Sequence, residues 1–260
     1  MSFLKNKNII NSILFFSTFF IVGVIIFDDY GISIDEDNTR LNGFVALKYL
    51  HDFFNLGYND FLKSIPDINE FNEKGIGYIF DLPTAAIEYF FEINDSREKY
   101  LTRHFVNFLF FFSGVIFFYL IILKKYNSII IAIIGSLLLI LSPRIFAESF
   151  YNNKDLIFLS LFIISTYWGI ELLKKPSISN ILIFSITSAM ATGIRILGIM
   201  LPVVIIFFFT IYILRNLKKD KQDVKLLILL ILTIPITILF FYPFLWDNPL
   251  ENFLFIFNRL

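Results

Sequence analysis

The feature that most constrains this chain is a series of apolar runs that recur along nearly its whole length. The runs hold about 15–20 residues each, which suits a helix crossing a hydrocarbon layer of ~30 Å. In lipid a backbone must satisfy its own hydrogen bonds, so these runs are expected to be helices. We expect seven spans, at Ile9–Phe27, Phe105–Leu123, Ser128–Leu141, Leu156–Leu173, Ile178–Thr192, Ile196–Leu214 and Leu226–Tyr242. The pattern predicts an all-α polytopic membrane protein.

Composition supports this class and removes several others. Of 260 residues, 57% are hydrophobic, whereas a soluble domain has roughly 45–50%. The net charge of +0 and the lack of a basic domain argue against nucleic acid as a partner. The chain has 0 Cys, which excludes disulfides and cysteine metal sites. No HExxH, P-loop or GxSxG pattern is present, so metalloprotease, nucleotide hydrolase and serine hydrolase functions lack support.

Basic residues predict the orientation of the spans. In the seven-span layout four basic clusters fall on one side, which the positive-inside rule makes cytoplasmic. The clusters are Lys5/Lys7, Lys124/Lys125, Lys174/Lys175 and Arg215/Lys218/Lys219/Lys221. Treating residues 178–214 as one span would put neighbouring clusters on opposite sides, so we reject that layout. We expect a multi-pass integral membrane protein with a cytoplasmic N-terminus.

The opposite side would carry the loops 28–104 and 143–155 and the segment 243–260. The passages RLNGFVALKYLHDFF and LPTAAIEYFFEI in the first of these loops have apolar residues at roughly helical spacing. They predict amphipathic juxtamembrane helices on the membrane surface, with acidic faces toward water. We expect residues 1–260 to form a single transmembrane domain with 28–104 as its first extracytoplasmic loop. The final LENFLFIFNRL begins another helix, so we expect a piece of a longer protein.

The first candidate site is acidic. Asp35, Glu36 and Asp37 follow the first span and precede a predicted amphipathic helix. Carboxylates near the membrane surface can act as general bases or bind a hard divalent cation. The alternative is an ordinary solvated acidic loop. No cofactor is indicated and no metal ligands are assigned, with a divalent cation left open.

A second candidate lies at the mouth between the third and fourth spans. Asp155 opens the fourth span, and the polar residues before it are Glu148, Tyr151, Asn152, Asn153 and Lys154. These polar groups predict part of an outer cavity. The alternative is that Asp155 only caps the helix N-terminus.

Basic residues supply the third and fourth candidates. Arg195 lies between two apolar stretches, where a charge is costly and a partner such as a lipid phosphate is expected. Arg103 and His104 begin the second span, and arginine suits phosphate. The alternatives are a snorkelling arginine at position 195 and interfacial anchoring at positions 103 and 104.

The sequence resembles the GT-C fold glycosyltransferases, in particular the bacterial dolichyl-phosphate-mannose-protein mannosyltransferase-like group. The resemblance covers essentially the whole chain and depends on the order of its passages relative to the spans. Those passages are SIDEDNTRLNGFVALKYL, YLTRHFVNFLFFFSGVIFFYLI, SPRIFAESFYNNKDLIFLSLF, GIRILGIMLP and YPFLWDNPLENF.

The resemblance implies an inverting transferase that moves a sugar from a polyprenyl-phosphate donor to an acceptor hydroxyl on the extracytoplasmic side. The acceptor would be a glycan, lipid or protein, and membrane lipids would surround the spans. The catalytic carboxylate would be Asp35 or Glu36. The donor phosphate would meet Arg195, Arg103 or His104. Asp155, Asn152, Asn153 and Lys154 would line the outer cavity.

Two other functions stay open at this stage. A transporter or flippase would place broken helices and polar groups near the bilayer midplane, and the break near Gly193–Gly198 is the one feature that favours it. A non-catalytic subunit or inactive fragment is the third reading. A sugar-transfer assay tests the enzyme, liposome flux without product formation would support transport, and the flanking reading frame would identify a fragment.

Overall fold

The structure of the protein is a computed structural model that describes residues 2–57, 59–71, 77–215 and 221–258, with only the backbone at residues 2–8. Lys218 and Lys219 lie outside the described residues. Every regular element in these ranges is helical. The elements are α1 Ser2–Ile26, η1 Phe27–Asp29, α2 Glu36–Phe53, α3 Asp60–Lys63, α4 Tyr78–Phe90, α5 Ser96–Tyr126, α6 Ile129–Ile140, α7 Pro143–Tyr151, α8 Asp155–Lys174, α9 Ile178–Ile194, η2 Ile196–Ile199, α10 Met200–Arg215, α11 Lys221–Phe241, η3 Pro243–Leu245 and α12 Pro249–Phe257.

Five stretches among the described residues are long and apolar enough to cross a membrane. They are Ile9–Asp29, Ser96–Tyr126, Asp155–Lys174, Ile196–Arg215 and Lys221–Phe241. The bent pair α6 and α7, which turns by 69°, gives up to six spans. The all-α, multi-pass membrane class is therefore confirmed, and the count of seven stays a prediction.

Two of the predicted spans differ in extent from the helices that form. The span at Ser128–Leu141 is realised as α6, which has 12 residues and stops where Pro143 begins α7 at a new angle. At 1.5 Å per residue such a helix covers only about 18 Å. The second span begins earlier than predicted, because Asp95 caps α5 through the Glu98 N–H at 3.0 Å.

Contacts divide the chain into two compact units, Met1–Ser33 with Asn94–Tyr167 and Ile34–Ile93 with Trp168–Leu260. Whether the chain acts as a single transmembrane domain, with 28–104 as its first outer loop, stays a prediction. Helix α8 contributes to both units, and each unit is described by itself.

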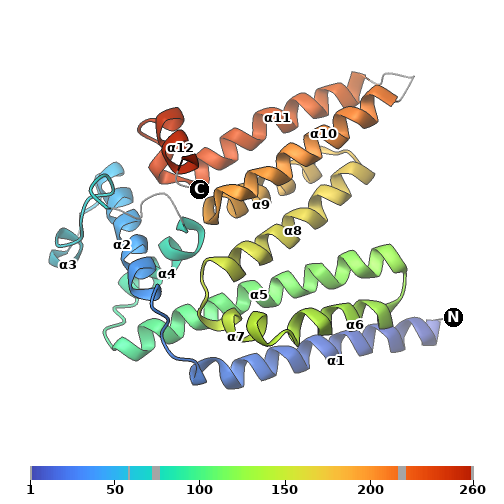
Figure 1. Ribbon diagram of the computed structural model, residues 1–260, viewed down its shortest axis with the longest axis horizontal. Helices are drawn as coiled ribbons and strands as arrows, with labels where there is room; N and C mark the ends of the chain where they lie inside the picture. Colours follow the sequence, from blue (N-terminus) through green and yellow to red (C-terminus); the bar gives the residue numbers. More distant parts are fainter. Residues whose placement is uncertain (1, 58, 72–76, 216–220, 259–260) are drawn as a thin grey trace. The chain divides into compact units, whose positions relative to one another are not determined.

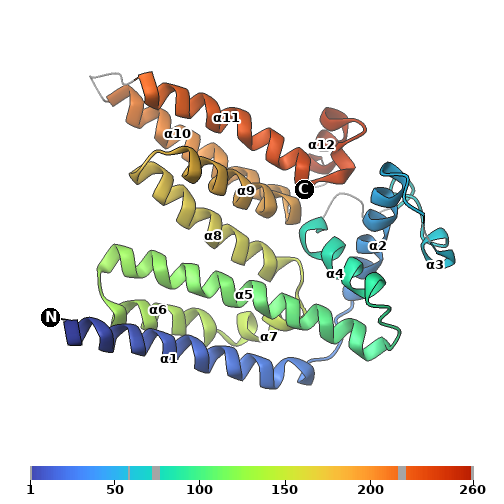
Figure 2. The same cartoon turned by 180° about the vertical axis from the view of Figure 1, so that it is seen from behind.

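In the first unit, α5 is the central helix. Both views show α1 and α6 beside it (Figures 1 and 2). The helices approach closely at glycines: a Cβ on Gly23 of α1 would lie 2.0 Å from the Phe108 ring, and one on Gly114 would lie 2.9 Å from Ser160 of α8. Phe108 also stacks on Phe150 of α7, with 5.4 Å between ring centroids. Small residues therefore set the helix spacing, and phenylalanines fill the layer between the helices.

In the second unit, α9, α10 and α11 lie side by side (Figure 1). Hydroxyl groups join α9 to α11: Ser185 and Thr233 share a hydrogen bond of 2.9 Å, and Thr237 donates to the Ser185 carbonyl at 3.2 Å. Hydroxyl groups that bond across apolar helices are a common means of joining helices in membranes.

The loop helices of the second unit form a layer in which α2 packs against α4. A Cβ on Gly43 of α2 would lie 2.2 Å from the Asp81 carbonyl oxygen of α4, so the two backbones are in direct contact. On another side of α2, the Lys48 ammonium donates to the Ile65 carbonyl at 2.6 Å and lies 2.7 Å from Asp67. Helix α2 is thus enclosed by its own loop over most of its length.

This enclosure corrects one expectation. The acidic residues of the two passages were expected to face water. Asp52 and Glu92 are exposed as expected, but Glu88 is buried, and so are Glu36 and Asp81, which directly precede the helical passages. Helix-on-helix packing explains the difference, because each buried carboxylate lies on a face that another segment covers. Whether the pair lies on a membrane surface stays a prediction.

The close approach of α2 and α4 makes Gly43 sensitive to substitution. We expect Gly43→Ala to lower stability by about 1–3 kcal/mol, because the added methyl group must separate the two helices. The measurement is the thermal unfolding midpoint of the purified protein in detergent. Gly31→Ala is the matched control, since a Cβ there meets nothing within 4 Å. Equal midpoints for the two variants would contradict the packing described.

Candidate functional site

The acidic segment resolves into residues with different environments. Asp35 is the N-cap residue of α2 and is exposed, whereas Glu36 is the first helical residue and is only 1% exposed. Successive helical residues point about 100° apart, so two adjacent carboxylates can face solvent and protein interior respectively. Asp37 is exposed, like Asp35. Asp35 and Asp37 are therefore the exposed carboxylates of this acidic segment.

A short chain of polar contacts fixes α2 to α4 and α4 to α9. The Asn42 amide on α2 donates to the Asp81 carboxylate at 3.0 Å. Gly77, which precedes α4, donates its backbone N–H to the Gly193 carbonyl near the end of α9 at 3.0 Å. Gly77 has φ 83, a left-handed conformation that favours glycine, and a Cβ there would lie 2.6 Å from the Asp81 carboxylate.

Arg195 occupies the break that α4 covers. The residue has φ −140 and ψ 129, so the helix ends there and the chain runs extended before η2. Its N–H donates to the Ala191 carbonyl at 3.1 Å, and its carbonyl accepts from the Gly198 N–H at 2.8 Å. The predicted break is confirmed, and the Arg195 backbone forms hydrogen bonds on both sides of it. The Arg195 side chain is half-buried at this position.

Two further contacts of this unit escaped the sequence analysis. Arg40 forms a bidentate ion pair with Glu88, with Arg40 Nε 2.7 Å from Glu88 Oε2. Residues 40 and 88 are far apart in sequence, so no local spacing could reveal their pairing. This pair joins α2 to α4 close to the acidic segment. Its bidentate geometry makes it stronger than an ion pair with a single contact.

The segment after α11 also contacts α2. The Tyr49 hydroxyl donates to Asp247 at 3.1 Å, and the Phe53 and Trp246 rings lie 4.9 Å apart edge to face. Burial of the phenol, together with its hydrogen bond to Asp247, raises the pKa of Tyr49 to about 12. Tyr49 therefore stays protonated at neutral pH, and its bond to the carboxylate is intact there.

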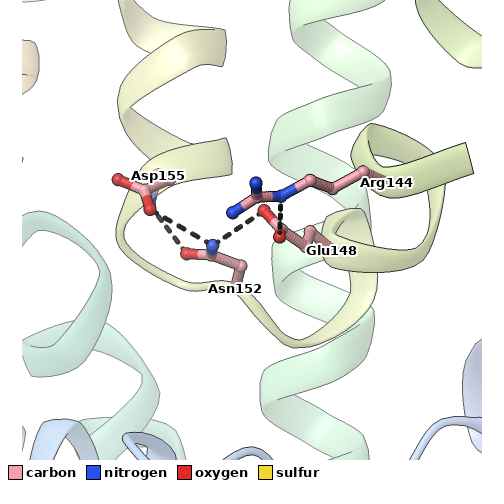
Figure 3. Close-up of polar contacts among 4 residues, drawn as sticks. All are labelled: Arg144, Glu148, Asn152 and Asp155. Carbon is pink, nitrogen blue, oxygen red and sulfur yellow. Dashed lines mark hydrogen bonds and ion pairs between the residues drawn. The ribbon is translucent and has the colours of Figure 1, made fainter. Parts of the chain in front are cut away.

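The first unit contains a second polar group at the turn between α7 and α8 (Figure 3). Arg144 Nε donates to Glu148 Oε1 at 2.7 Å, and the Asn152 amide donates to Glu148 Oε2 at 3.0 Å and to Asp155 Oδ2 at 3.3 Å. The Arg144 side chain is 85% exposed and Asp155 is exposed, whereas Glu148 is largely covered. The chain of contacts thus links an exposed cation to an exposed carboxylate through two less accessible residues.

Asn152, rather than Asp155, accepts hydrogen bonds from the backbone N–H groups at the start of α8. Its side-chain oxygen accepts the Asp155 N–H at 2.8 Å and the Lys154 N–H at 3.3 Å. The capping role considered for Asp155 therefore belongs in good part to Asn152, and the Asp155 carboxylate faces the Asn152 amide. Asn153 is buried and Lys154 is half-buried. Glu148 was among the predicted residues, whereas Arg144 was not, although its (i, i+4) spacing to Glu148 on a helix is a recognisable signal.

Arg103 and His104 lie inside α5 rather than at its beginning. They are 2% and 1% exposed, and the neighbouring Asn107 is equally buried and donates to the Glu148 carbonyl at 3.3 Å. Since α5 starts at Ser96, the two residues have more than one helical turn before them. The covered position is unlike that of a side chain reaching out to an interface.

The predicted residues therefore fall into two groups. Asp35, Glu36 and Arg195 belong to the second unit, and the contacts between α2, α4 and α9 connect the elements that carry them. The first unit holds the others, which are Arg103, His104, Glu148, Tyr151, Asn152, Asn153, Lys154 and Asp155. Across the described residues no group of three or more His, Asp or Glu side chains is arranged to hold a metal ion.

Comparison with known families decides the class of protein. A family model described as dolichyl-phosphate-mannose-protein mannosyltransferase matches residues 83–239, which is more than half of the chain. The chain belongs to this family. Searches of curated proteins and of solved structures found no match. The resemblance drawn from the sequence is thus confirmed, and this mannosyltransferase-family member is a membrane glycosyltransferase for which a lipid-linked sugar donor is implied.

Membership in the mannosyltransferase family leaves the transporter alternative without support. The helix break that favoured transport is bonded to the loop helix α4 through Gly77 and Gly193. The matched range begins within α4, so it includes Arg103, Asp155 and Arg195 and leaves Asp35 and Glu36 before it. The family match therefore gives no support to a catalytic role for Asp35 or Glu36, and that role depends on the geometry of the acidic segment alone.

The two roles of Asn152 can be separated by substitution. Asn152→Ala removes both the helix-start acceptor and the amide donor, and we expect a loss of about 1 kcal/mol. Asn152→Asp keeps an acceptor but sets a third carboxylate beside Glu148 and Asp155. Its stability deficit against wild type should shrink as pH falls, because protonation removes the repulsion and restores a donor. Thermal unfolding midpoints at pH 5 and pH 8 measure this, and a pH-independent deficit would contradict the contacts described.

Proposed function

We propose that this protein transfers mannose or a related hexose from a polyprenyl-phosphate donor to an acceptor hydroxyl on the extracytoplasmic side, with inversion at the anomeric carbon. Family membership supports the reaction class. The observation that carries the assignment of residues is the exposed Asp35 carboxylate at the start of a helix that is anchored to the break holding Arg195. The acceptor is a glycan, a lipid or a protein, and the assay described below distinguishes them.

Asp35 acts as the general base in this proposal. Its carboxylate is accessible, and α2 is held rigidly by Asn42, Arg40 and Tyr49. A base must be positioned within hydrogen-bond reach of the proton that it removes, so an anchored helix end is a suitable carrier. The buried Glu36 supports α2 from within and does not reach the acceptor.

Arg195 contacts the donor phosphate in the same scheme. The acceptor oxygen, losing its proton to Asp35, attacks the anomeric carbon on the face opposite the phosphate. The bond from that carbon to the phosphate oxygen breaks, and the polyprenyl phosphate departs with both bonding electrons. A half-buried guanidinium at this point stabilises the additional negative charge as it develops.

The residues of the first unit have supporting roles in the proposal. Asp155, Asn152, Asn153 and Lys154 line an outer cavity beside the exposed Arg144. Arg103 and His104 remain candidates for the donor phosphate, but both are buried, so a ligand reaches them only after neighbouring side chains move. Their burial favours Arg195 as the first contact.

The proposed topology has seven crossings of a bacterial inner membrane, with a cytoplasmic N-terminus. It adds the bent pair α6–α7 and the 17-residue helix α9 to the five longer spans. Two sets of contacts support this layout. The first loop meets both the α9 break and the segment after α11 in the second unit. In the first unit Arg97 lies 3.8 Å from Asp28, so the expected outer ends of two spans are neighbours.

The proposed base is tested by Asp35→Asn. We expect kcat to fall about 10²–10⁴-fold, the usual contribution of a general base, with little change in thermal stability. The assay uses membrane-reconstituted protein, a polyprenyl-phosphate mannose donor, and glycan, lipid and peptide acceptors in parallel. Asp37→Asn is the matched control, because Asp37 is also an exposed carboxylate close to Asp35, and it should retain activity. Full activity of Asp35→Asn would refute this role, and absence of transfer by wild type with every acceptor would support the inactive-fragment reading.

The proposed phosphate contact is tested by comparing Arg195→Gln with Arg195→Lys. Loss of the charge should lower kcat about 10²-fold, as removal of one group that stabilises a developing anion does. Lysine should restore part of the activity, since it keeps the charge but lacks the planar fork. Equal activities of wild type and Arg195→Gln would contradict the assignment.

A further inference from the structure

A group of polar side chains at the turn between α7 and α8 takes no part in the bond-making steps proposed above (Figure 3). Arg144, Glu148 and Tyr151 are spaced by four and three residues on α7, so they lie on one face of that helix. Asp155 begins α8 on the other side of the turn. Figure 3 shows the Arg144 guanidinium extending toward Asp155, with Asn152 in the turn between them.

Hydrogen bonds hold this group in one arrangement, although its two ends are exposed. Glu148 is the centre: Oε1 accepts from Arg144 Nε at 2.7 Å, and Oε2 accepts from the Asn152 amide at 3.0 Å. The Glu148 side chain is only 17% exposed, whereas that of Arg144 is 85% exposed. From α5, the buried Asn107 donates its amide to the Glu148 carbonyl at 3.3 Å. A side chain that is already held loses less rotamer freedom when it binds a ligand.

The arrangement presents a donor, an acceptor and an aromatic ring to water. Within the described residues the hydrogen bond of the Arg144 side chain is made by Nε, so its two terminal amino groups remain available as donors. The exposed Asp155 carboxylate is an acceptor. The half-buried Tyr151 adds a ring on the face of α7 that carries Arg144, and this ring lies 6.1 Å from that of Tyr30.

The charges of the turn favour a neutral polar ligand over an ion. Two basic residues, Arg144 and Lys154, are balanced by two acidic ones, Glu148 and Asp155. A phosphate would meet both carboxylates and a divalent cation would meet both basic side chains, so neither ion gains from the whole group. Sugar hydroxyl groups donate and accept at once, so two adjacent hydroxyl groups can bond to a guanidinium and a carboxylate that lie side by side.

We propose that the α7–α8 turn binds a pyranose sugar, with Arg144 and Asp155 bonded to neighbouring hydroxyl groups and the Tyr151 ring against the apolar face of the sugar. Glu148 and Asn152 are positioning residues that hold the two contacting groups. The inference rests on the proposed function, in which the donor and a glycan acceptor both carry a sugar, and the kinetic test below separates these two sources. A site that bonds a hydroxyl group rejects sugars that lack it, so the turn contributes to specificity.

Direct binding tests the site without depending on catalysis. The full chain in detergent is examined by saturation-transfer NMR with the methyl glycosides of mannose, glucose and galactose. We expect wild type to bind at least one of them. Arg144→Gln and Asp155→Asn should each weaken that binding about tenfold, the effect of losing one hydrogen bond to a charged group.

Arg97→Gln is the matched control for the binding test and should leave the affinity unchanged. Arg97 is another exposed arginine of the first unit, with a side chain 71% exposed and 3.8 Å from Asp28. Failure of wild type to bind any of the three glycosides, or equal losses in Arg144→Gln and Arg97→Gln, would overturn the proposal.

Steady-state kinetics identify which substrate supplies the sugar. Arg144→Gln should raise KM about tenfold for one substrate and change kcat much less, because the contact is equally present in the bound substrate and the transition state. A raised KM for the donor assigns the donor sugar, and a raised KM for a glycan acceptor assigns the acceptor. Unchanged KM values for both in an active enzyme would refute this site and leave the proposed reaction standing. Sugar binding that requires Arg144 in a protein without transfer activity would refute the reaction alone.

The positioning role of Glu148 is tested by a double-mutant cycle. Glu148→Gln removes the charge that anchors Arg144, so it should raise KM for the same substrate as Arg144→Gln does. Combining the two changes should give little further increase, because Glu148 acts through Arg144. Fully additive increases would mean that the two residues act independently and would contradict the positioning role.

Discussion

The second unit depends on hydrogen bonds to the backbone groups at one break in an apolar hairpin. Between α9 and α10 the chain leaves helical geometry at Arg195, and its backbone groups lose their regular partners. In a hydrocarbon environment each unsatisfied group costs several kcal/mol, so such a break must be covered by protein. The cover is α4, whose preceding Gly77 donates to the Gly193 carbonyl, while Gly198 closes the other side of the turn. A helix of the loop 28–104 therefore helps to satisfy the backbone of the apolar helices at this break.

The same requirement explains how the candidate site is assembled. Because α4 lies on the break and α2 lies on α4 at Gly43, the acidic start of α2 is connected through α4 to the segment that holds Arg195. In the proposed reaction these are the groups that remove a proton and stabilise the departing phosphate. This loop packing buries Glu36 and so restricts the movement of the start of α2. The adjacent Asp35 is thereby held in position.

The sequence predicted the class, the break and both loop helices, because apolar run length, glycine placement and helical periodicity are local signals. It failed where the cause was non-local. The pairing of Arg40 with Glu88 joins residues from different helices, and the burial of Arg103 depends on α5 starting at Ser96. The different environments of Asp35 and Glu36 could not be read from adjacent letters, since they follow from which face of α2 is covered. Whether α6 and α9 complete seven crossings also depends on more than length.

The proposed reaction requires that the first loop, the α7–α8 turn and the segment after α11 lie on the same side of the membrane. The chain has 0 Cys, so single cysteines can be introduced without a background. A membrane-impermeant maleimide applied to intact cells with a permeable outer envelope should label Asp37→Cys, Arg144→Cys and Asn248→Cys. It should label Lys125→Cys, Lys175→Cys and Lys221→Cys only after the inner membrane is opened. Labelling of Asp37→Cys and Arg144→Cys from opposite sides would contradict the account.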